Sequence, residues 1–242
     1  MKTSFKNLEG MELQARDGAI GTVKDLLIDD HHWVVRYLVV STGHWLPGRR
    51  VLIAANELES YVADKKYLAV DLSQDEIRNS PEAASRSELS REYETDLHRH
   101  YGWAAYWAEP GVSGGQLISP AAAPTAAAVR DMFTSERPVE NAGADGVMAD
   151  ERAAEKRPLL RSAHELCRYH VEAKDGPIGH VADFGIEVRG WSVPTFVVDA
   201  HLWWPGEEAF VGTGHILEID SENKKLWLSL TREAVKGGPR TT

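Results

Sequence analysis

Hydrophobic and polar residues alternate over short stretches of the chain, the pattern of half-buried β-strands. Near the N-terminus Met11, Leu13 and Ala15 alternate with polar residues and lead into Asp17-Gly18. Asp-Gly between alternating segments is a strong hairpin signal, because glycine adopts positive φ without strain. Further strands are predicted at 23–28, 34–40, 51–53 and 67–72, with polar turns at 29–32 and 64–66. Five or six short strands within about 75 residues favour a small barrel or sandwich.

The same pattern returns later in the chain as an internal repeat. Asp17–Asp25 recurs as Asp175–Asp183, and the match continues without a gap from Ser4–Pro81 to Ser162–Pro239. About 21 of about 78 aligned positions are identical, and tryptophan, glycine and proline are among them. Self-similarity over this length indicates that one domain has been duplicated.

Single residues refine the expected strands. Gly21 lies inside a returning strand and predicts a bulge or a sharp bend. Ser73 and Glu76 have the spacing of a capping box and predict a short helix before Pro81. In the second copy Pro194 replaces Arg36. Since proline cannot donate to a strand ladder, an edge or a bulge is expected there.

Between the copies lie two segments of different composition. Residues 82–109 contain aromatic and leucine residues at near-helical spacing among charges, which predicts an amphipathic helix. Residues 110–158 are rich in alanine, glycine and proline and have few large apolar residues, which is typical of a linker that is partly disordered. The predicted organisation is therefore a first domain at 1–81, a helical segment, a linker and a second domain at 159–242.

Composition and charge narrow the function classes. The 43% hydrophobic residues are enough for a core, and no apolar run approaches the ~20 residues of a membrane-spanning helix. The net charge of −10 is spread along the chain without a basic block, so we expect no direct contact with nucleic acid. A single cysteine, Cys167, and an N-terminus without an apolar signal core favour the cytoplasm.

Motifs of catalysis and metal binding are weak. Residues 111–115 match the Gly-x-Ser-x-Gly nucleophile motif, but they lie in the linker rather than between a strand and a helix. The paired histidines of one copy, such as His31-His32, are not repeated in the other, so no metal or cofactor is expected. Hydrogen bonding at turns and strand ends explains Asp25 and Asp183, and likewise Asp17 and Asp175, better than acid–base catalysis.

Aromatic loops and a reversal of charge mark the candidate binding residues. Trp-x-Pro-Gly occurs in an equivalent loop of each copy, and Arg49-Arg50 after the first loop aligns with Glu207-Glu208 after the second. Packing over a barrel end and partner binding are both open for these tryptophans, since tryptophan is enriched in binding hot spots. The candidate partner-binding residues are Trp45, Pro47, Arg49, Arg50, Tyr101, Trp103, Trp107, Trp203, Trp204, Glu207 and Glu208.

The repeated motif resembles the PRC-barrel family, named after the cytoplasmic domain of the photosynthetic reaction centre H subunit. Asp-Gly-x-Ile-Gly-x-Val-x-Asp, an acidic turn with tryptophan, Val-Arg-Tyr-Leu-Val-Val and Trp-x-Pro-Gly carry the resemblance in the first copy. The segment that ends in Tyr101-Gly102-Trp103 is similar to the tail after the first barrel of bacterial tandem members. The resemblance implies an all-β protein of two small antiparallel barrels with short flanking helices, used for assembly rather than catalysis.

A non-enzymatic scaffold or adaptor that binds a protein partner in the cytoplasm is therefore the predicted function. Two alternatives stay open: a carrier of a small ligand in a barrel or inter-barrel groove, and an RNA-processing or ribosome-associated adaptor. The twin domains also suggest packing of barrel on barrel, within one chain or in a homodimer. In one hypothesis Arg49 and Arg50 face Glu207 and Glu208. Whether the copies exchange a strand or a helix is open at this point.

Overall fold

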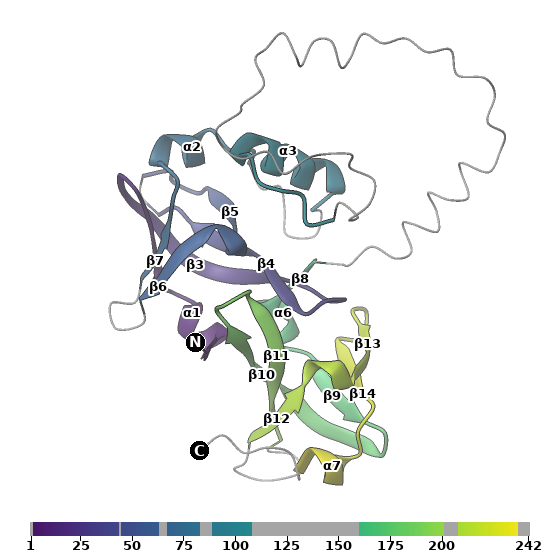
Figure 1. Cartoon of the computed structure of the whole chain (residues 1–242). Coiled ribbons are helices and arrows are strands. Elements are labelled where there is room, and N and C mark those ends of the chain that lie inside the picture. The colour runs from purple at the N-terminus through teal and green to yellow at the C-terminus, as the bar shows by residue number, and fades with distance from the viewer. Residues whose placement is uncertain are drawn as a thin grey trace, which may run out of the picture. The chain divides into compact units, whose positions relative to one another are not determined.

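The computed structural model describes residues 2–43, 45–62, 67–82, 89–107, 160–200 and 208–236. About half of these residues lie in strands and far fewer lie in helices, all of which are short (Figure 1), so the prediction of an all-β protein with short flanking helices is confirmed. The elements of the first repeat, with the helix that follows it, are β1 (Lys2–Ser4), α1 (Phe5–Leu8), β2 (Glu12–Ala15), β3 (Gly18–Asp29), β4 (Val34–Ser41), β5 (Arg50–Ala54), η1 (Ala55–Glu57), β6 (Leu58–Val62), β7 (Tyr67–Val70), α2 (Gln74–Arg78) and α3 (Arg91–Tyr101).

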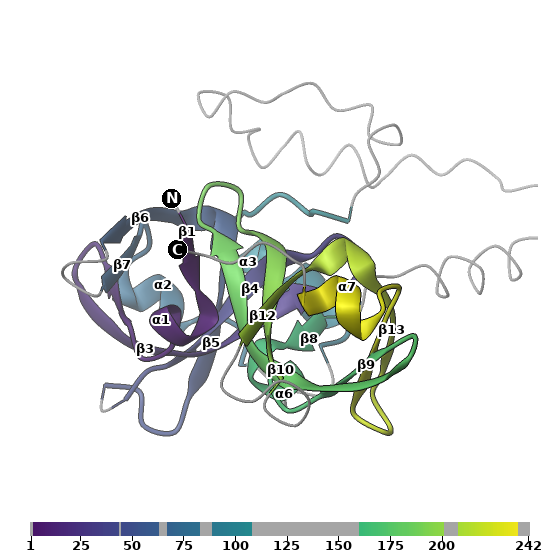
Figure 2. The ribbon, with the colours of Figure 1, turned by 90° about the horizontal axis from the view of Figure 1, so that it is seen from below.

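The second repeat has the same order of elements. They are β8 (Leu160–Ser162), α6 (Ala163–Leu166), β9 (His170–Ala173), β10 (Gly176–Glu187), β11 (Ser192–Asp199), β12 (Glu208–Gly212), η3 (Thr213–His215), β13 (Ile216–Asp220), β14 (Lys225–Leu228) and α7 (Arg232–Lys236). The strand order β6-β7-β2-β3-β4-β5 matches β13-β14-β9-β10-β11-β12. Figure 2 shows the curl of the second sheet around α7.

Each curled sheet is antiparallel except at one place. β2 pairs in parallel with β7, and β9 pairs in parallel with β14, which the sequence did not predict. Alternate residues of the long central strands point inward and form the core. Ile20, Val23, Leu26 and Leu38 are fully buried in the first repeat, and Ile178, Val181 and Phe196 are fully buried in the second.

The irregular positions that the sequence predicted lie at bulges. Ile20 is the extra residue where Leu13 pairs with Gly21 and Gln14 with Ala19, so the register shifts next to Gly21. A Cβ on Gly21 would lie 1.9 Å from the carbonyl oxygen of Ser41, which explains why only glycine fits this bend. The register also shifts between Gly185 and Glu187, opposite Pro194, so the bulge expected there is confirmed.

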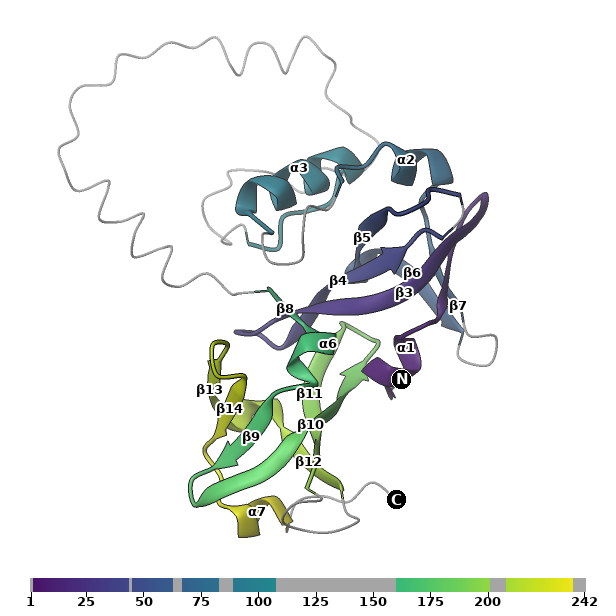
Figure 3. The same ribbon diagram turned by 180° about the vertical axis from the view of Figure 1, so that it is seen from behind.

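The repeats exchange their first strands. β1 of the first repeat pairs with β10 of the second, and β8 pairs with β3 of the first. The short helix after each exchanged strand follows it, so that α1 contacts β10 and α6 contacts β3 (Figure 3). The question that the sequence left open is thereby answered: a strand and a helix are exchanged in both directions.

Two aspartates at equivalent positions stabilise the exchanged arrangement by accepting hydrogen bonds from the other repeat. Asp25 on β3 accepts hydrogen bonds from the Ser162 hydroxyl at 2.5 Å and from the His164 backbone N–H at 3.0 Å. Asp183, its counterpart on β10, accepts from the Lys6 backbone N–H at 3.1 Å. Each carboxylate therefore caps the start of the other repeat's first helix, where unpaired N–H groups favour an anion.

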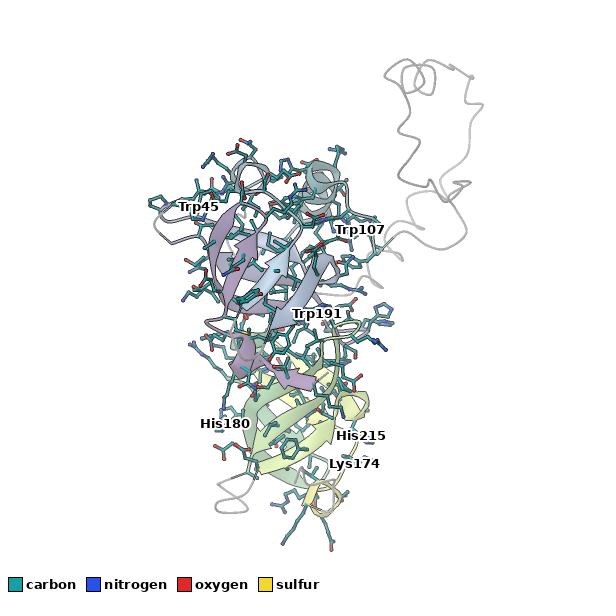
Figure 4. All side chains as sticks on the ribbon, turned by 60° about the vertical axis from the view of Figure 1, so that its left-hand side comes forward. Trp45, Trp107, Lys174, His180, Trp191 and His215 are labelled. Atoms are coloured by element: carbon teal, nitrogen blue, oxygen red, sulfur yellow. The ribbon has the colours of Figure 1, made fainter. Side chains whose placement is uncertain are left out.

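A second junction joins the turns that precede β4 and β11. Val35 donates its backbone N–H to the carbonyl of Trp191, and Val193 donates to that of Trp33, at 2.9 and 2.7 Å. Both tryptophans have positive φ, 53° and 56°, a conformation that costs a bulky residue about 1–3 kcal/mol. Trp191 is buried where the repeats meet (Figure 4), and the Trp33 ring stacks on Phe184 at 6.4 Å, so burial offsets this cost.

Candidate interaction surface

The tryptophan of the first aromatic loop is held by its own repeat. The Trp45 indole N–H donates to the carbonyl oxygen of Ile20, and the Arg78 guanidinium lies 5.4 Å from the ring centroid. Thr42 closes the base of the loop by donating to the carbonyl of Leu46 at 2.6 Å. Trp45 is half-buried, while Pro47 is exposed. Of the two interpretations left open for this tryptophan, packing over the barrel end is the one that these contacts support.

The basic pair after that loop divides into two roles. Arg49 donates from its guanidinium to the backbone carbonyls of Arg78 and Ser80 at the end of α2, where carbonyl groups lack helical partners. Arg50 is exposed at the start of β5. The Arg49 guanidinium thus binds within its own repeat. Glu207 lies outside the described residues, so the hypothesis that the basic pair faces Glu207 and Glu208 stays a prediction.

Most of the equivalent loop of the second repeat lies outside the described residues. This applies to Trp203, Trp204 and Glu207, so their predicted role in binding stays a prediction. Glu208 is described: it is exposed at the start of β12 and pairs across the sheet with Asp199 on β11.

The amphipathic helix predicted in residues 82–109 is α3, which ends at Tyr101 before Gly102 with φ +71°. It is bound to the first repeat through a buried polar cluster. The Tyr37 hydroxyl on β4 donates to Glu94 at 3.0 Å and lies 2.7 Å from His98 Nε2, and Arg91 pairs with Glu94 at 2.9 Å. Sequence reasoning missed this cluster; a tyrosine pointing outward from a central strand was its only trace.

The aromatic residues of this segment are largely covered. Burial raises the pKa of Tyr93 and of Tyr101 to about 12, so both phenols stay protonated at neutral pH. Beyond the helix Trp103 is buried, and Trp107 packs edge-on against Tyr106 with ring centroids 4.9 Å apart. Tyr101 and Trp107 are half-buried.

A buried carboxylate explains the histidine pair of the first repeat. Asp29 accepts from the backbone N–H groups of His31 and His32 at 3.0 and 2.9 Å, and from the Arg36 guanidinium at 2.6 Å. Burial alone would raise the pKa of Asp29, but the hydrogen bonds from His32 and Arg36 outweigh it and hold the pKa below its usual value. These residues therefore fix the turn before β4.

The outer faces of the two repeats differ in a way that the sequence did not indicate. In the first repeat, the outward residues of β4 and β5 are buried: Tyr37, Val39, Leu52 and Ala54. In the second, the equivalent residues of β11 and β12 are all partly exposed: Thr195, Val197, Phe210 and Gly212. Two large apolar side chains are also exposed on the β13–β14 hairpin, Leu217 at 67% and Trp227 at 38%.

Other chemistry within the described residues is limited. No group of three histidine, cysteine, aspartate or glutamate side chains among them could hold a metal ion, and none of their helices has the length and hydropathy needed to cross a membrane. Burial raises the pKa of the Cys167 thiol to about 12. The Gly-x-Ser-x-Gly match at 111–115 lies outside the described residues.

Comparison with known proteins gives one family. Residues 3–77 match the PRC-barrel domain, and the curated proteins contain no match to the chain. The matched range begins at Thr3 within β1, covers β2 to β7 and ends at Ile77 within α2. The second repeat shares its strand order with the first, although the family match does not extend to it. The first repeat of this protein is a PRC-barrel domain.

Proposed function

We propose that this protein is a non-enzymatic adaptor that binds a partner protein through its second repeat. The observation that carries the proposal is the exposure of Leu217 and Trp227 on the β13–β14 hairpin. The equivalent residues of the first repeat are Glu59 and Ala69, so only the second repeat has large apolar side chains at these two positions. Large exposed apolar side chains, tryptophan above all, are typical of binding hot spots.

The roles of the polar groups support an adaptor rather than an enzyme. Asp25 and Asp183 cap helices across the repeat junction, and Asp29 fixes a turn, so these carboxylates are engaged in holding the fold. The Cys167 thiol, with its pKa raised to about 12, is protonated at neutral pH and is a poor nucleophile. A single protonated cysteine also fits a reducing cytoplasm, where we place the protein.

The test is capture of partners by the tagged full-length protein from its native cells, followed by native mass spectrometry. We compare the wild type with Leu217→Ser/Trp227→Ser, and use Glu59→Ser/Ala69→Ser as the matched control at the equivalent positions of the first repeat. The proposal expects a stoichiometric protein partner that is lost with the first variant and kept with the second. If the wild type elutes without a protein and carries a discrete small-molecule mass, a ligand carrier replaces the adaptor.

A further inference from the structure

The outer side of β11 and β12 carries three cross-strand pairs that differ in character. Along the two strands Thr195 pairs with Gly212, Val197 with Phe210, and Asp199 with Glu208. All six side chains or glycine positions are at least partly exposed. We call this set the β11–β12 face. Its side chains are small at the Thr195–Gly212 end, apolar in the middle and acidic at the Asp199–Glu208 end.

The equivalent face of the first repeat already binds a helix. Its three pairs are Tyr37–Ala54, Val39–Leu52 and Ser41–Arg50. Figure 1 shows α3 beside β4 and β5, and the Tyr37 hydroxyl joins the helix through Glu94 and His98. α3 is amphipathic and buries Leu97 completely. The duplicated fold therefore accepts an amphipathic helix at this place, where the middle pair, Val39 and Leu52, is buried.

The side chains of the β11–β12 face differ in size from those of the first repeat's face, in a way that suits a helix different from α3. Thr195 and Gly185 replace Tyr37 and Leu27, so the sheet has less side-chain bulk here and its backbone can be approached more closely. A Cβ on Gly185 would lie only 2.4 Å from Thr195 Oγ1, which shows that the threonine packs down onto that glycine. A helix at this end can therefore lie nearer to the strands than α3 does.

The charge at the other end of the face is reversed. Asp199 and Glu208 lie directly opposite each other, where the first repeat has Ser41 and Arg50. Like charges at directly opposed positions of a sheet are unfavourable, and a cation placed over them relieves the repulsion. His180 Nε2 lies 3.7 Å from the Asp199 carboxylate, and this histidine is charged only when protonated.

We propose that the β11–β12 face binds an amphipathic helix of a partner protein that has an aliphatic stripe and lysine or arginine at one end. The middle pair, Val197 and Phe210, takes the aliphatic stripe; the equivalent pair of the first repeat, Val39 and Leu52, is buried. The basic end of the helix lies over Asp199 and Glu208. This inference rests on the proposed adaptor function and gives the chemical class of its partner.

The test uses fluorescence anisotropy of labelled synthetic peptides with the purified full-length protein. The probe is a leucine/lysine peptide of about 18 residues, or five helical turns, with the lysines concentrated at one end. A leucine/glutamate peptide of the same pattern and a leucine/lysine peptide with a scrambled pattern are the two comparison probes. We expect the first peptide to bind, and the other two to bind at least about tenfold more weakly.

Protein variants locate the binding site. Val197→Ser/Phe210→Ser removes the apolar pair, and Asp199→Asn/Glu208→Gln removes the acidic pair; each is expected to weaken binding about five- to thirtyfold. Glu165→Gln/Glu222→Gln is the matched control, because it also removes two exposed carboxylates of the second repeat but lies outside the face. Thermal unfolding of each variant confirms that it is folded before binding is measured.

Three results of the peptide and sedimentation measurements would overturn the inference. One is equal weakening by the control and by Asp199→Asn/Glu208→Gln, because binding would then follow net charge alone. Another is unchanged peptide binding by Val197→Ser/Phe210→Ser. The third is a wild-type dimer in sedimentation that becomes monomeric in that variant, which would make a second copy the occupant. If Val197→Ser/Phe210→Ser captures native partners as well as the wild type does, the adaptor function stands but the β11–β12 face is not the binding site. If the wild type captures no partner, the adaptor function itself fails.

Discussion

Removal of the Asp25 carboxylate should destabilise both repeats at once. Asp25 is fully buried, and its carboxylate accepts hydrogen bonds from the Leu26 N–H at 2.8 Å, from Ser162 Oγ and from the His164 N–H. In Asp25→Ala these donors lose their partner inside the protein. Hydrogen bonds to a charged group contribute about 1.5–3 kcal/mol each, and some loss is recovered by relaxation. We expect the free energy of unfolding to fall by about 3–5 kcal/mol.

The equivalent substitution in the second repeat, Asp183→Ala, serves as an internal comparison. Asp183 is only half-buried and accepts from two backbone donors, Lys6 N–H and Phe184 N–H, at 3.1 and 2.8 Å. Water can reach these groups in Asp183→Ala, so we expect a loss of about 1–2 kcal/mol. Two substitutions of the same chemistry at equivalent positions should therefore differ by at least about 1 kcal/mol.

The assay is urea unfolding followed by tryptophan fluorescence, with thermal unfolding as a second measurement. For a protein of this size 1 kcal/mol corresponds to about 2–4 °C, so Asp25→Ala should lower the melting temperature by roughly 10 °C. A single shifted transition is expected, because the exchanged strands couple the repeats. Equal losses in the two variants, or two separated transitions in Asp25→Ala, would refute this account of the junction.

Three further predictions concern single sites. Gly179→Ala should cost at least about 3 kcal/mol of stability, because its Cβ would lie 1.8 Å from the carbonyl oxygen of Asp199, while Gly214→Ala, which meets open space, should be close to neutral; similar urea midpoints for the two would contradict this. Arg36→Ala should cost about 3 kcal/mol at pH 7, because it leaves Asp29 buried without its ion pair. Because the pKa of Asp29 is lowered in the folded protein, its contribution to stability is present above its unfolded pKa of about 4 and is lost as pH falls further. The difference in stability between Arg36→Ala and wild type should therefore shrink below about pH 4, and a constant difference from about pH 7 to 3 would contradict this. Cys167, with its pKa raised to about 12, should react with iodoacetamide at pH 8 far more slowly in the folded protein than in urea, and equal rates would show that the thiol is accessible as thiolate.

The two repeats differ in the charge and the packing of their outer faces. The first repeat uses its outer face to hold α3, with Tyr37 as the buried polar link. The second repeat has the same strands, but its equivalent face is partly exposed and carries acidic residues at one end. We propose that the duplication leaves one copy to support the chain's own helix and the other to present its sheet to a partner.

The sequence by itself determined the repeat, the positions of most strands along each copy and the local irregularities. Alternating residues specify which side of a strand is buried, because side chains point to opposite faces with a period of two. Gly21 and Pro194 indicate bulges, because glycine fits where a Cβ would collide with the neighbouring strand and proline has no backbone N–H to donate. The Ser73–Glu76 capping box formed as predicted, since its hydrogen bonds lie within four residues.

Only the tertiary structure decided how the two copies combine. Pairing of β1 with β10 and of β8 with β3 joins segments far apart in sequence, and the backbone groups involved would pair as well with their own repeat. Asp25 and Asp183 carry no sign in the sequence of which helix they cap. The exposure of Phe210 beside the burial of Leu52 likewise depends on whether a helix covers the strand, which a strand's own pattern does not record. Local preference fixes the elements, whereas long-range packing alone selects their partners.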